Sequence, residues 1–271
     1  MKLSSATVKW SAIEKRLKEA EYFYLFLDYD GTLTPIAATP QEAVLSPEVK
    51  GLLQKLLKCP HCKLAIITGR SLDDIKTRVA LKNVVYVGNH GFEIEGGDLK
   101  FNSLITPKLR NIFEEIKKEV KGLSVEMKEI LIEDKRATLS IHYRLLDEKR
   151  FPLFLKAVRE IVKPYLEQKE IRLTEGKKVI ELRPAIVWDK GEAVKWLLIK
   201  EEFNKGTKNI LPIYIGDDAT DEDAFATIGR RGITIIVGKR DKSKAQYCLE
   251  DTEDVFRFLV NILETMKAKA L

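Results

Sequence analysis

The sequence predicts an α/β protein whose parallel sheet is covered by helices on both faces. Five apolar runs have the length of buried strands, and each stops at a polar or glycine-rich loop. These runs lie at residues 22–27, 64–67, 84–87, 211–215 and 233–237. Helical patterns precede or separate several of them, at residues 7–20, 46–58, 72–80, 191–203 and 221–228. Because strands and helices alternate, we expect right-handed crossovers, with ligands bound at the carboxyl ends of the strands.

A different rhythm at residues 103–185 predicts an inserted domain of α+β type. Its expected elements are a helix, two alternating strands, a second helix and a hairpin, at residues 107–122, 124–133, 138–143, 149–169 and 171–182. The flanking stretches, 1–102 and 186–271, then form the core around the parallel sheet. We expect the insertion to be a cap that covers the active edge of the core and closes over a substrate.

Charge and hydropathy argue against two classes of partner. The 271 residues include 47 Lys and Arg and 41 Asp and Glu, a net charge of +6, but basic and acidic residues are mostly interleaved, as at 114–119. This is typical of a solvated helix face rather than a nucleic-acid-binding stripe. No apolar run approaches the roughly 20 residues that span a bilayer, and residues 1–10 lack the apolar stretch of a signal peptide. We therefore expect a cytoplasmic monomer that binds neither nucleic acid nor membrane.

Two of the three cysteines form the run Cys59-Pro60-His61-Cys62. This is the spacing of thioredoxin-like redox motifs, but a redox pair opens a helix, whereas this pair follows a predicted helix and leads into a strand. A structural zinc site needs four ligands, and the sequence has no second pair. We expect a tight turn here, and the sequence leaves open whether the pair forms a disulfide.

Two carboxylates follow the first predicted strand, in the run Asp28-Tyr29-Asp30-Gly31-Thr32. An extended backbone would aim Asp28 and Asp30 the same way, and Gly31 would let the backbone approach an anion closely. This pattern favours metal-assisted phosphoryl transfer. Asp28 would attack phosphorus and form an aspartyl phosphate. Asp30 would protonate the leaving oxygen and later deprotonate the hydrolytic water.

Thr68 and Lys190 are the candidate phosphate-binding residues. Thr68 follows the second predicted strand, where its hydroxyl and N–H suit a phosphate oxygen. The same segment also predicts a helix start capped by Ser71. Lys190 begins a predicted helix, and its charge there would neutralise phosphate and stabilise the Asp28 anion.

An acidic run, from Gly216 to Asp223, follows the fourth predicted strand. Carboxylates packed this closely repel one another unless a cation lies among them, and a set of oxygen ligands favours Mg²⁺. We expect Asp217 to bind the metal directly, with Asp218 and Asp221 in the shell around it. Some of these acids also stabilise the start of the helix at residue 221.

Together the four motifs resemble those of the haloacid-dehalogenase superfamily, and most of all those of the trehalose-6-phosphate phosphatase family. The run Leu27–Ile36 is similar to the opening motif of that family, and Gly216–Phe225, GDDATDEDAF, is similar to its last motif. The expected cap contains the family's E-x-K, H-Y-R and G-K-x-x-x-E-x-x-P elements, at Glu133–Lys135, His142–Arg144 and Gly176–Pro184. The resemblance covers nearly the whole chain after its first predicted helix.

The resemblance implies a Rossmann-like core, hydrolysis of trehalose 6-phosphate, and Mg²⁺ held by the Asp28 and Asp217 carboxylates and the Asp30 backbone carbonyl. It also implies that polar cap residues bind the sugar hydroxyls: Glu133, Lys135, Arg144, Lys177 and Glu181. We expect Asn89 and His90 to reach either the sugar or the cap, and His142 to support its neighbours. The sequence shows no synthase-like domain, so a substrate supplied by a trehalose-6-phosphate synthase would arrive by diffusion.

The sequence leaves two other functions open. Another glycosyl phosphate, such as mannosyl- or glucosyl-3-phosphoglycerate, would need the same chemistry with different cap contacts. A catalytically silent relative would act as a regulatory binding module. Such a protein would be expected to lose Asp28, Asp30 or Lys190, and this sequence keeps all three.

Overall fold

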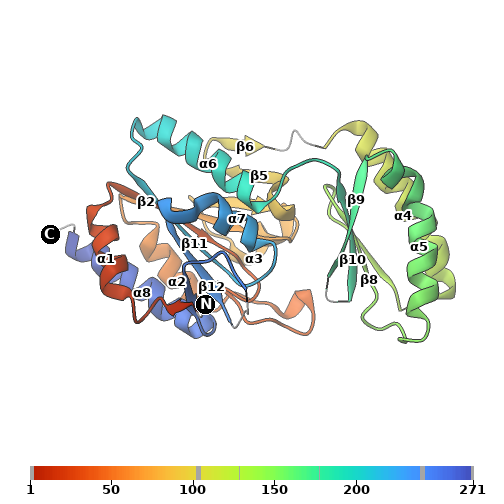
Figure 1. Ribbon diagram of the computed structural model, residues 1–271, viewed down its shortest axis with the longest axis horizontal. Coiled ribbons are helices and arrows are strands. Elements are labelled where there is room, and N and C mark those ends of the chain that lie inside the picture. The colour runs from red at the N-terminus through yellow and green to blue at the C-terminus, as the bar shows by residue number, and fades with distance from the viewer. Residues whose placement is uncertain (1–2, 102–104, 128, 177, 239–241, 270–271) are drawn as a thin grey trace. The chain divides into compact units, whose positions relative to one another are not determined.

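The computed structural model describes residues 3–101, 105–127, 129–176, 178–238 and 242–269 (Figure 1). The chain forms two compact units, one made of Met1–Phe101 with Trp188–Leu271 and the other of Asn102–Val187. We call the first the core and the second the inserted unit. Among the described residues, no helix has both the length and the apolar character needed to cross a bilayer. The role of the inserted unit as a cap stays a prediction.

A nine-stranded sheet forms the centre of the core. Its strands lie in the order β1 (Ser4–Ser5), β13 (Tyr247–Leu249), β12 (Ile233–Val237), β11 (Ile210–Gly216), β2 (Tyr22–Leu27), β3 (Cys62–Ile67), β4 (Val85–Gly88), β5 (Glu93–Gly96) and β6 (Leu99–Phe101). All pairs from β1 to β4 are parallel, whereas β5 and β6 add an antiparallel hairpin at one edge. The five predicted strands correspond to β2, β3, β4, β11 and β12, so the predicted fold class is confirmed.

Strand β2 shows why these sequences form a sheet buried on both sides. Successive side chains of a strand point to opposite faces, and here both sets are apolar. Phe23, Leu25 and Leu27 pack into one hydrophobic cluster, and Tyr24 and Phe26 pack into another. A strand with this pattern is stable only between two layers of helices.

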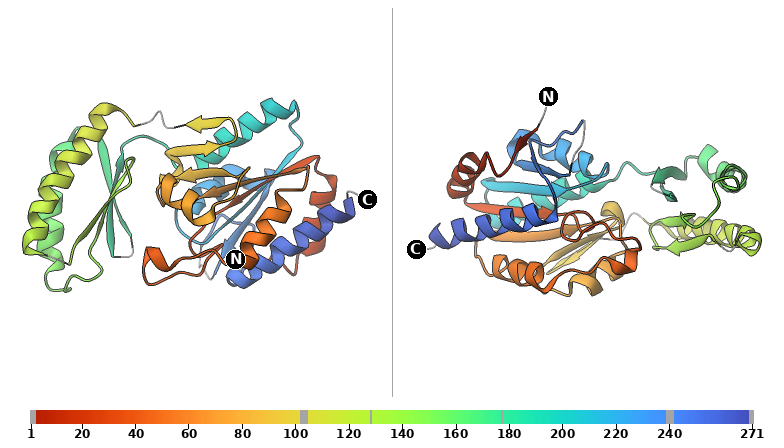
Figure 2. Two further views of the ribbon diagram at one scale, coloured as in Figure 1. Left: turned by 180° about the vertical axis from the view of Figure 1, so that it is seen from behind. Right: turned by 90° about the horizontal axis from the view of Figure 1, so that it is seen from below.

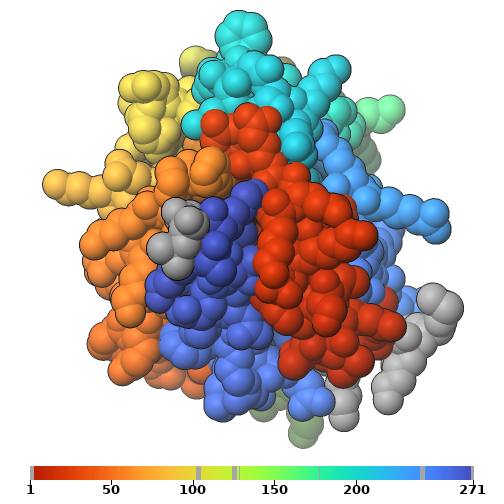
Figure 3. All heavy atoms as spheres, turned by 90° about the vertical axis from the view of Figure 1, so that its left-hand side faces the viewer, coloured from red at the N-terminus to blue at the C-terminus, as the bar shows by residue number. Residues whose placement is uncertain are grey.

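Helices cover each face of the sheet (Figure 2). One face packs against α1 (Trp10–Glu19), α2 (Pro47–Leu56), α3 (Leu72–Val79) and α8 (Thr252–Lys269). The other packs against α6 (Lys190–Lys205) and α7 (Asp221–Ile228). Figure 3 shows α8 lying between α1 and α2 on the first face. Within the described part of the core there are also three short 3₁₀ helices: η1 (Pro40–Glu42), η2 (Asn89–Gly91) and η3 (Gly229–Arg231).

As far as the structure describes its residues, the inserted unit contains a four-stranded antiparallel sheet and two helices, α4 (Pro107–Glu126) and α5 (Phe151–Glu167). The strand order is β7 (Leu131–Asp134), β8 (Leu139–His142), β10 (Val179–Pro184) and β9 (Ile171–Gly176). Leu182 pairs with Leu139 and is buried with it, whereas the adjacent pair is Glu181 with Ser140. One face of this sheet is therefore apolar and packs against the helices, and the opposite face is polar.

One predicted element of the inserted unit is wrong. The strand expected at 124–133 does not form over its first half, because α4 continues to Glu126 and β7 begins only at Leu131. The helical spacing of buried residues continues past Gly122, since Val120 and Met127 lie two turns apart and are both buried. A glycine inside a helix costs only about 1 kcal/mol, so Gly122 does not end this one.

The cysteine pair lies in the turn between α2 and β3, as expected. The Cys62 N–H donates to the Cys59 carbonyl at 3.0 Å, and both thiols are free. Burial raises the pKa of each thiol above its ordinary value, which keeps the reactive thiolate scarce. These contacts are those of a structural turn.

Candidate active site

Asp28 lies directly after β2, at the carboxyl edge of the core sheet. Because Leu27 pairs with Ile66 of β3 and with Ile215 of β11, the ends of three strands meet here. The Asp28 N–H donates to the Ile215 carbonyl at 2.9 Å, and the residue is only 5% exposed. The Asp28 carboxylate is therefore held at a buried strand end.

Lys190, the first residue of α6, places a cation beside this carboxylate. Its Nζ donates to Asp28 Oδ1 at 2.7 Å and to Asp221 Oδ1 at 2.8 Å, and the residue is 2% exposed. Burial alone would lower the pKa of Lys190, but the charges of Asp221 and Asp28 raise it well above its ordinary value. These charges favour the protonated, cationic form of Lys190 beside Asp28; its role toward phosphate stays a prediction.

Asp221, the first residue of α7, is fully buried and accepts hydrogen bonds from four donors. Its Oδ1 accepts from Lys190 and from the Tyr214 hydroxyl, the latter at 2.7 Å. Its Oδ2 accepts from the backbone N–H groups of Asp217 and Asp218, both at 3.0 Å. Since both oxygens are already used, the contacts of Asp221 are those of a residue that shapes the loop and positions Lys190.

Asp217 and Asp218 lie side by side in that loop but differ in environment. Burial and the charges of Asp221 and Asp218 raise the pKa of Asp217 to about 7. Burial also acts on Asp218, but the charge of Lys190 and hydrogen bonds from Thr220 outweigh it and hold the pKa of Asp218 at about 2. Of the two, Asp217 is the carboxylate that a bound cation would stabilise more.

The carboxylate oxygens at this edge of the sheet are suitable ligands for a divalent metal ion. Carboxylate oxygens of Asp28, Asp217 and Asp221 all lie within 4.8 Å of one another, and because those of Asp221 already accept hydrogen bonds, Asp28 and Asp217 are the more available ligands. Burial raises the pKa of Asp28 well above its ordinary value although Lys190 lowers it, and the neighbouring aspartates raise it further. A cation among these oxygens would relieve the repulsion, and oxygen donors suit Mg²⁺.

Gly31 allows the loops after β2 and β11 to meet at this point. Its φ is +79°, and a Cβ there would overlap the Asp217 carboxylate. Any other residue would therefore be strained in its backbone and would displace Asp217. From the sequence, Gly31 is expected to let the backbone approach an anion. In the structure, Gly31 also makes room for the Asp217 carboxylate.

Thr68 follows β3 and is almost completely buried. Its Oγ1 accepts from the Arg70 N–H at 3.2 Å, and its carbonyl accepts from the His90 N–H at 3.0 Å. Asn89 and His90 both have left-handed backbone angles, with φ of 50° and 56°. A Cβ on Gly69 would overlap the His90 ring, so a glycine is needed for the two loops to pack. Thr68 and His90 are thus neighbours, and what they bind stays a prediction.

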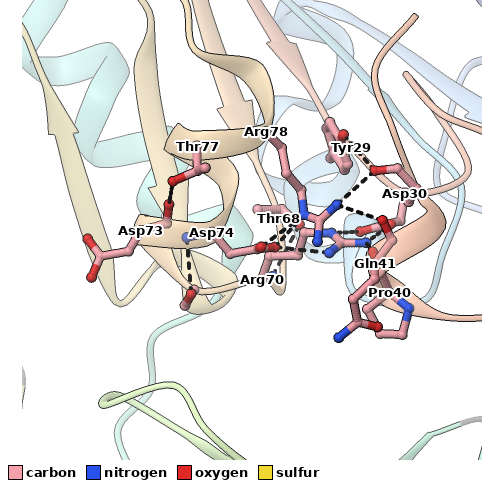
Figure 4. A network of polar contacts seen from close by, with 12 residues as sticks. Tyr29, Asp30, Pro40, Gln41, Thr68, Arg70, Asp73, Asp74, Thr77 and Arg78 are labelled. Atoms are coloured by element: carbon pink, nitrogen blue, oxygen red, sulfur yellow. Dashed lines mark hydrogen bonds and ion pairs between the residues drawn. The ribbon is translucent and has the colours of Figure 1, made fainter.

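Asp30 belongs to a second charged network, which was not expected from the sequence (Figure 4). Arg70 donates to both carboxylate oxygens of Asp30 and to one oxygen of Asp74. Arg78 in turn donates to both oxygens of Asp74. The available signal was the four-residue spacing of Arg70, Asp74 and Arg78. Residues four positions apart are neighbours on the surface of a helix.

Three predicted sugar ligands of the inserted unit, Glu133, Lys135 and Glu181, form one network in the structure. Lys135 Nζ lies 3.9 Å from Glu133 Oε2 and 3.6 Å from Glu181 Oε1. His142 Nε2 lies 2.9 Å from Glu133 Oε2, so His142 joins this network. The expected support of Tyr143 or Arg144 by His142 stays a prediction. Arg183 was missed, and its Nε donates to Glu181 Oε2 at 2.7 Å. Its position two residues after Glu181, on the same face of the strand, was the available signal.

The two other predicted sugar ligands of the inserted unit are Arg144 and Lys177. Arg144 is exposed in the turn after β8. Lys177 lies outside the described residues.

The core has the fold of the haloacid-dehalogenase superfamily, and solved structures share it over almost the whole chain. The C-terminal domain of the Candida albicans trehalose-6-phosphate phosphatase superposes with a TM-score of 0.78 at 23% identity, covering 97% of this chain and 98% of that one. A trehalose-6-phosphate phosphatase related protein superposes with a TM-score of 0.75 at 24% identity, covering 90% and 99%. At these identities the likeness establishes the fold.

The sequence profile of the family described as Trehalose-phosphatase matches residues 26–253, and this chain belongs to that family. Trehalose-phosphate phosphatase B of Arabidopsis thaliana is 36% identical over 259 residues, which cover 89% of this chain and 66% of the plant protein. Probable trehalose-phosphate phosphatase 4 of Oryza sativa subsp. japonica is 36% identical over 247 residues, covering 89% and 65%. The chain thus spans just under two thirds of the length of these two relatives.

Proposed function

We propose that this chain hydrolyses trehalose 6-phosphate to trehalose and inorganic phosphate, with Mg²⁺ and through an aspartyl-phosphate intermediate. The contact of Lys190 with Asp28 carries the proposal, because it holds a buried carboxylate and a cation at the edge where such sheets bind ligands. Membership of the trehalose-phosphatase family supports the choice of substrate. So do the names of the plant relatives, which are trehalose-phosphate phosphatases.

In the first step, an oxygen of Asp28 attacks phosphorus, and the bond from phosphorus to the sugar oxygen breaks. The phosphoryl group moves to Asp28, and the leaving sugar oxygen takes a proton from Asp30. Lys190 offsets the negative charge of the transferring group, and the Thr68 hydroxyl holds one of its oxygens. The step yields trehalose and the aspartyl phosphate.

In the second step, water attacks the phosphorus of the aspartyl phosphate. The bond from phosphorus to the Asp28 oxygen breaks, and the water proton passes to Asp30. This restores the Asp28 carboxylate and the acid form of Asp30, and releases inorganic phosphate. Asp30 gives up a proton in the first step and takes one up in the second, so the same residue serves as acid and then as base.

Mg²⁺ would be held by the carboxylates of Asp28 and Asp217 and by the backbone carbonyl of Asp30, with Asp218 and Asp221 around it. When bound, it would offset the charge that accumulates as a phosphate approaches several carboxylates. The environment of Asp217 supports this assignment, since burial and the charges of Asp221 and Asp218 raise its pKa to about 7, and a nearby cation would favour the carboxylate. We expect EDTA to stop phosphate release and Mg²⁺ to restore it. Undiminished turnover in excess EDTA would contradict the metal site.

Sugar recognition is assigned to polar residues of the inserted unit and to the loop after β4. A disaccharide is bound by donors and acceptors, and a site built from such groups rejects analogues that lack a hydroxyl. The network of Glu133, Lys135 and Glu181 offers both kinds of group on one polar sheet face. Four further residues complete the proposed set: Arg144, Lys177, Asn89 and His90.

A phosphate-release panel tests the substrate. We expect kcat/KM for trehalose 6-phosphate to exceed that for glucose 6-phosphate and for mannosyl- and glucosyl-3-phosphoglycerate. If kcat/KM is higher for either phosphoglycerate, that compound and not trehalose 6-phosphate is the preferred substrate. No phosphate release from any member would favour a silent binding module, although the retained Asp28, Asp30 and Lys190 argue against it.

The cellular setting follows from the same proposal. A phosphatase of this kind consumes the product of a trehalose-6-phosphate synthase and therefore depends functionally on one. We propose that the chain acts as a cytoplasmic monomer. Gel filtration with light scattering tests the monomer, and a dimer at micromolar concentration would contradict it.

A further inference from the structure

Arg70 fixes the orientation of the Asp30 carboxylate. Its Nε donates to Asp30 Oδ2 at 2.7 Å, and its Nη2 donates to Asp30 Oδ1 at 2.6 Å (Figure 4). Two parallel hydrogen bonds between a guanidinium and a carboxylate define the plane of the carboxylate as well as its position. A lysine in place of Arg70 would offer a point charge without that geometry.

Arg70 is itself anchored by groups other than Asp30. Its Nη1 donates to Asp74 Oδ2 at 2.9 Å, and its Nη2 also donates to the Pro40 carbonyl at 2.9 Å. The guanidinium lies over the ring of the buried Tyr29, 5.4 Å from the ring centroid. Arg70 is therefore a fixed support, and Asp30 is the residue whose position depends on it.

Stability is only part of what this contact provides. The Asp30 side chain is 41% exposed and that of Arg70 is 10% exposed, so the bidentate pair and its network add stability although water screens the Asp30 end. Without Arg70, Asp30 would be free to populate several side-chain rotamers. The contact matters most for a carboxylate that must present one oxygen in one direction, and proton transfer makes that demand.

We propose that Arg70 is a positioning residue for proton transfer by Asp30. The inference rests on the proposed function, because it takes Asp30 as the group that protonates the leaving oxygen. Arg70 acts through Asp30: it presents the Asp30 carboxylate in the orientation that proton transfer requires. Loss of Arg70 should therefore slow the departure of leaving groups that need a proton, and spare those that leave as stable anions.

Arg78 supplies a matched control. It donates to both oxygens of Asp74 and to the carbonyls of Gln41 and Ala43, so it supports the same loop and helix as Arg70. Within the described residues its contacts are with these groups and not with Asp30. An effect that comes only from weakening this network should thus appear in Arg78→Lys as well as in Arg70→Lys.

The test is a leaving-group series. For wild type, Arg70→Lys, Arg78→Lys and Asp30→Asn, kcat/KM is measured on trehalose 6-phosphate and on aryl phosphates from p-nitrophenyl to phenyl phosphate. This parameter reports steps up to the departure of the leaving group and excludes later hydrolysis of the intermediate. We expect Arg70→Lys to lose about 10- to 100-fold on trehalose 6-phosphate and on phenyl phosphate, which is part of the roughly 10²- to 10⁴-fold that general acid catalysis contributes. We expect losses below about threefold on p-nitrophenyl phosphate, and for Arg78→Lys on every substrate.

Asp30→Asn separates failure of this inference from failure of the proposed function. If Asp30→Asn shows the steep leaving-group dependence and Arg70→Lys does not, the positioning role of Arg70 is wrong and the acid role of Asp30 stands. If Asp30→Asn loses equally on all substrates, the acid role itself is wrong. Equal losses in Arg70→Lys and Arg78→Lys would reduce Arg70 to a structural residue. Arg70→Gln gives a second variant if Arg70→Lys does not fold, as checked by thermal unfolding.

Discussion

The core and the inserted unit each place one lysine between two carboxylates, yet the two groups differ in distance and burial. In the core, Lys190 lies 2.7 Å from Asp28 and 2.8 Å from Asp221, and all three residues are buried. In the inserted unit, Lys135 lies 3.9 Å and 3.6 Å from Glu133 and Glu181, and the Glu133 side chain is 41% exposed. A lysine and two carboxylates thus form a cluster with short distances and buried side chains in the core. In the inserted unit they form one with longer distances and a partly exposed Glu133.

This difference suits two different tasks. A buried ion pair keeps its geometry because neither partner has water as an alternative. Longer, partly exposed pairs are weak and exchange easily for hydrogen bonds to a ligand. The core cluster therefore suits the proposed phosphoryl transfer. The network of the inserted unit suits the proposed binding of sugar hydroxyl groups.

The largest effect should come from Asp28 in the core cluster. We expect Asp28→Asn to lower kcat by at least about 10⁴-fold, since an amide does not attack phosphorus as a carboxylate does. Phosphate release is the measurement, and the exposed Asp98 supplies the control variant Asp98→Asn, which should keep wild-type turnover. Comparable turnover in Asp28→Asn would remove Asp28 from the nucleophile role and with it the contrast between the two clusters.

The second largest effect should be on the free energy of unfolding, which the two clusters should affect differently. Lys190→Ala leaves two buried carboxylates without their cation, and breaking a buried pair in this way costs about 3–5 kcal/mol. Lys135→Ala breaks two longer pairs, but Glu133 is partly exposed and Glu181 keeps its hydrogen bond from Arg183, so the cost should stay below about 1 kcal/mol. Urea unfolding of the metal-free proteins measures both. Equal costs would show that burial does not distinguish the clusters.

Selectivity should change most in the inserted unit. We expect Glu181→Ala and Lys135→Ala to lower kcat/KM for trehalose 6-phosphate by about 10- to 100-fold, with losses below about threefold on p-nitrophenyl phosphate. The aryl phosphate lacks the sugar that these residues are proposed to bind. Glu175→Ala is the control, because Glu175 pairs across the sheet with Ile180 and lies on the opposite face from Glu181. Parallel losses on both substrates would mean that this face does not read the sugar.

The smallest effect concerns Asp74, at the edge of the core site. Burial raises its pKa, but hydrogen bonds from Arg78 and Arg70 outweigh burial and leave the pKa below its ordinary value. The folded state therefore binds fewer protons here than the unfolded state, whose aspartates titrate near pH 3.9, and stability is lost as the pH falls through that range. We expect the difference in unfolding free energy between wild type and Asp74→Asn to shrink from about pH 5 to about pH 3. A constant difference across that range would contradict the linkage.

Much of the core could be predicted because its signals are local. A run of apolar residues such as Tyr22–Leu27 has only one stable environment, between two layers of helices, and it ends where the first aspartate appears. The inserted unit was harder, because the boundary between α4 and β7 depends on burial along the helix, and Gly122 gave a misleading signal. Residues 124–133 thus follow tertiary packing rather than local propensity.

The sequence alone determined which side chains stand at the strand ends, because the two-residue period of a strand and the stops of the apolar runs are written in it. Only the tertiary structure decided which of them meet. Lys190 reaches Asp28 across 162 positions of the chain, and Arg70 reaches Asp30 across 40. No local pattern encodes those distances, since they arise when parallel strands bring their ends to one edge and buried charges must find partners there.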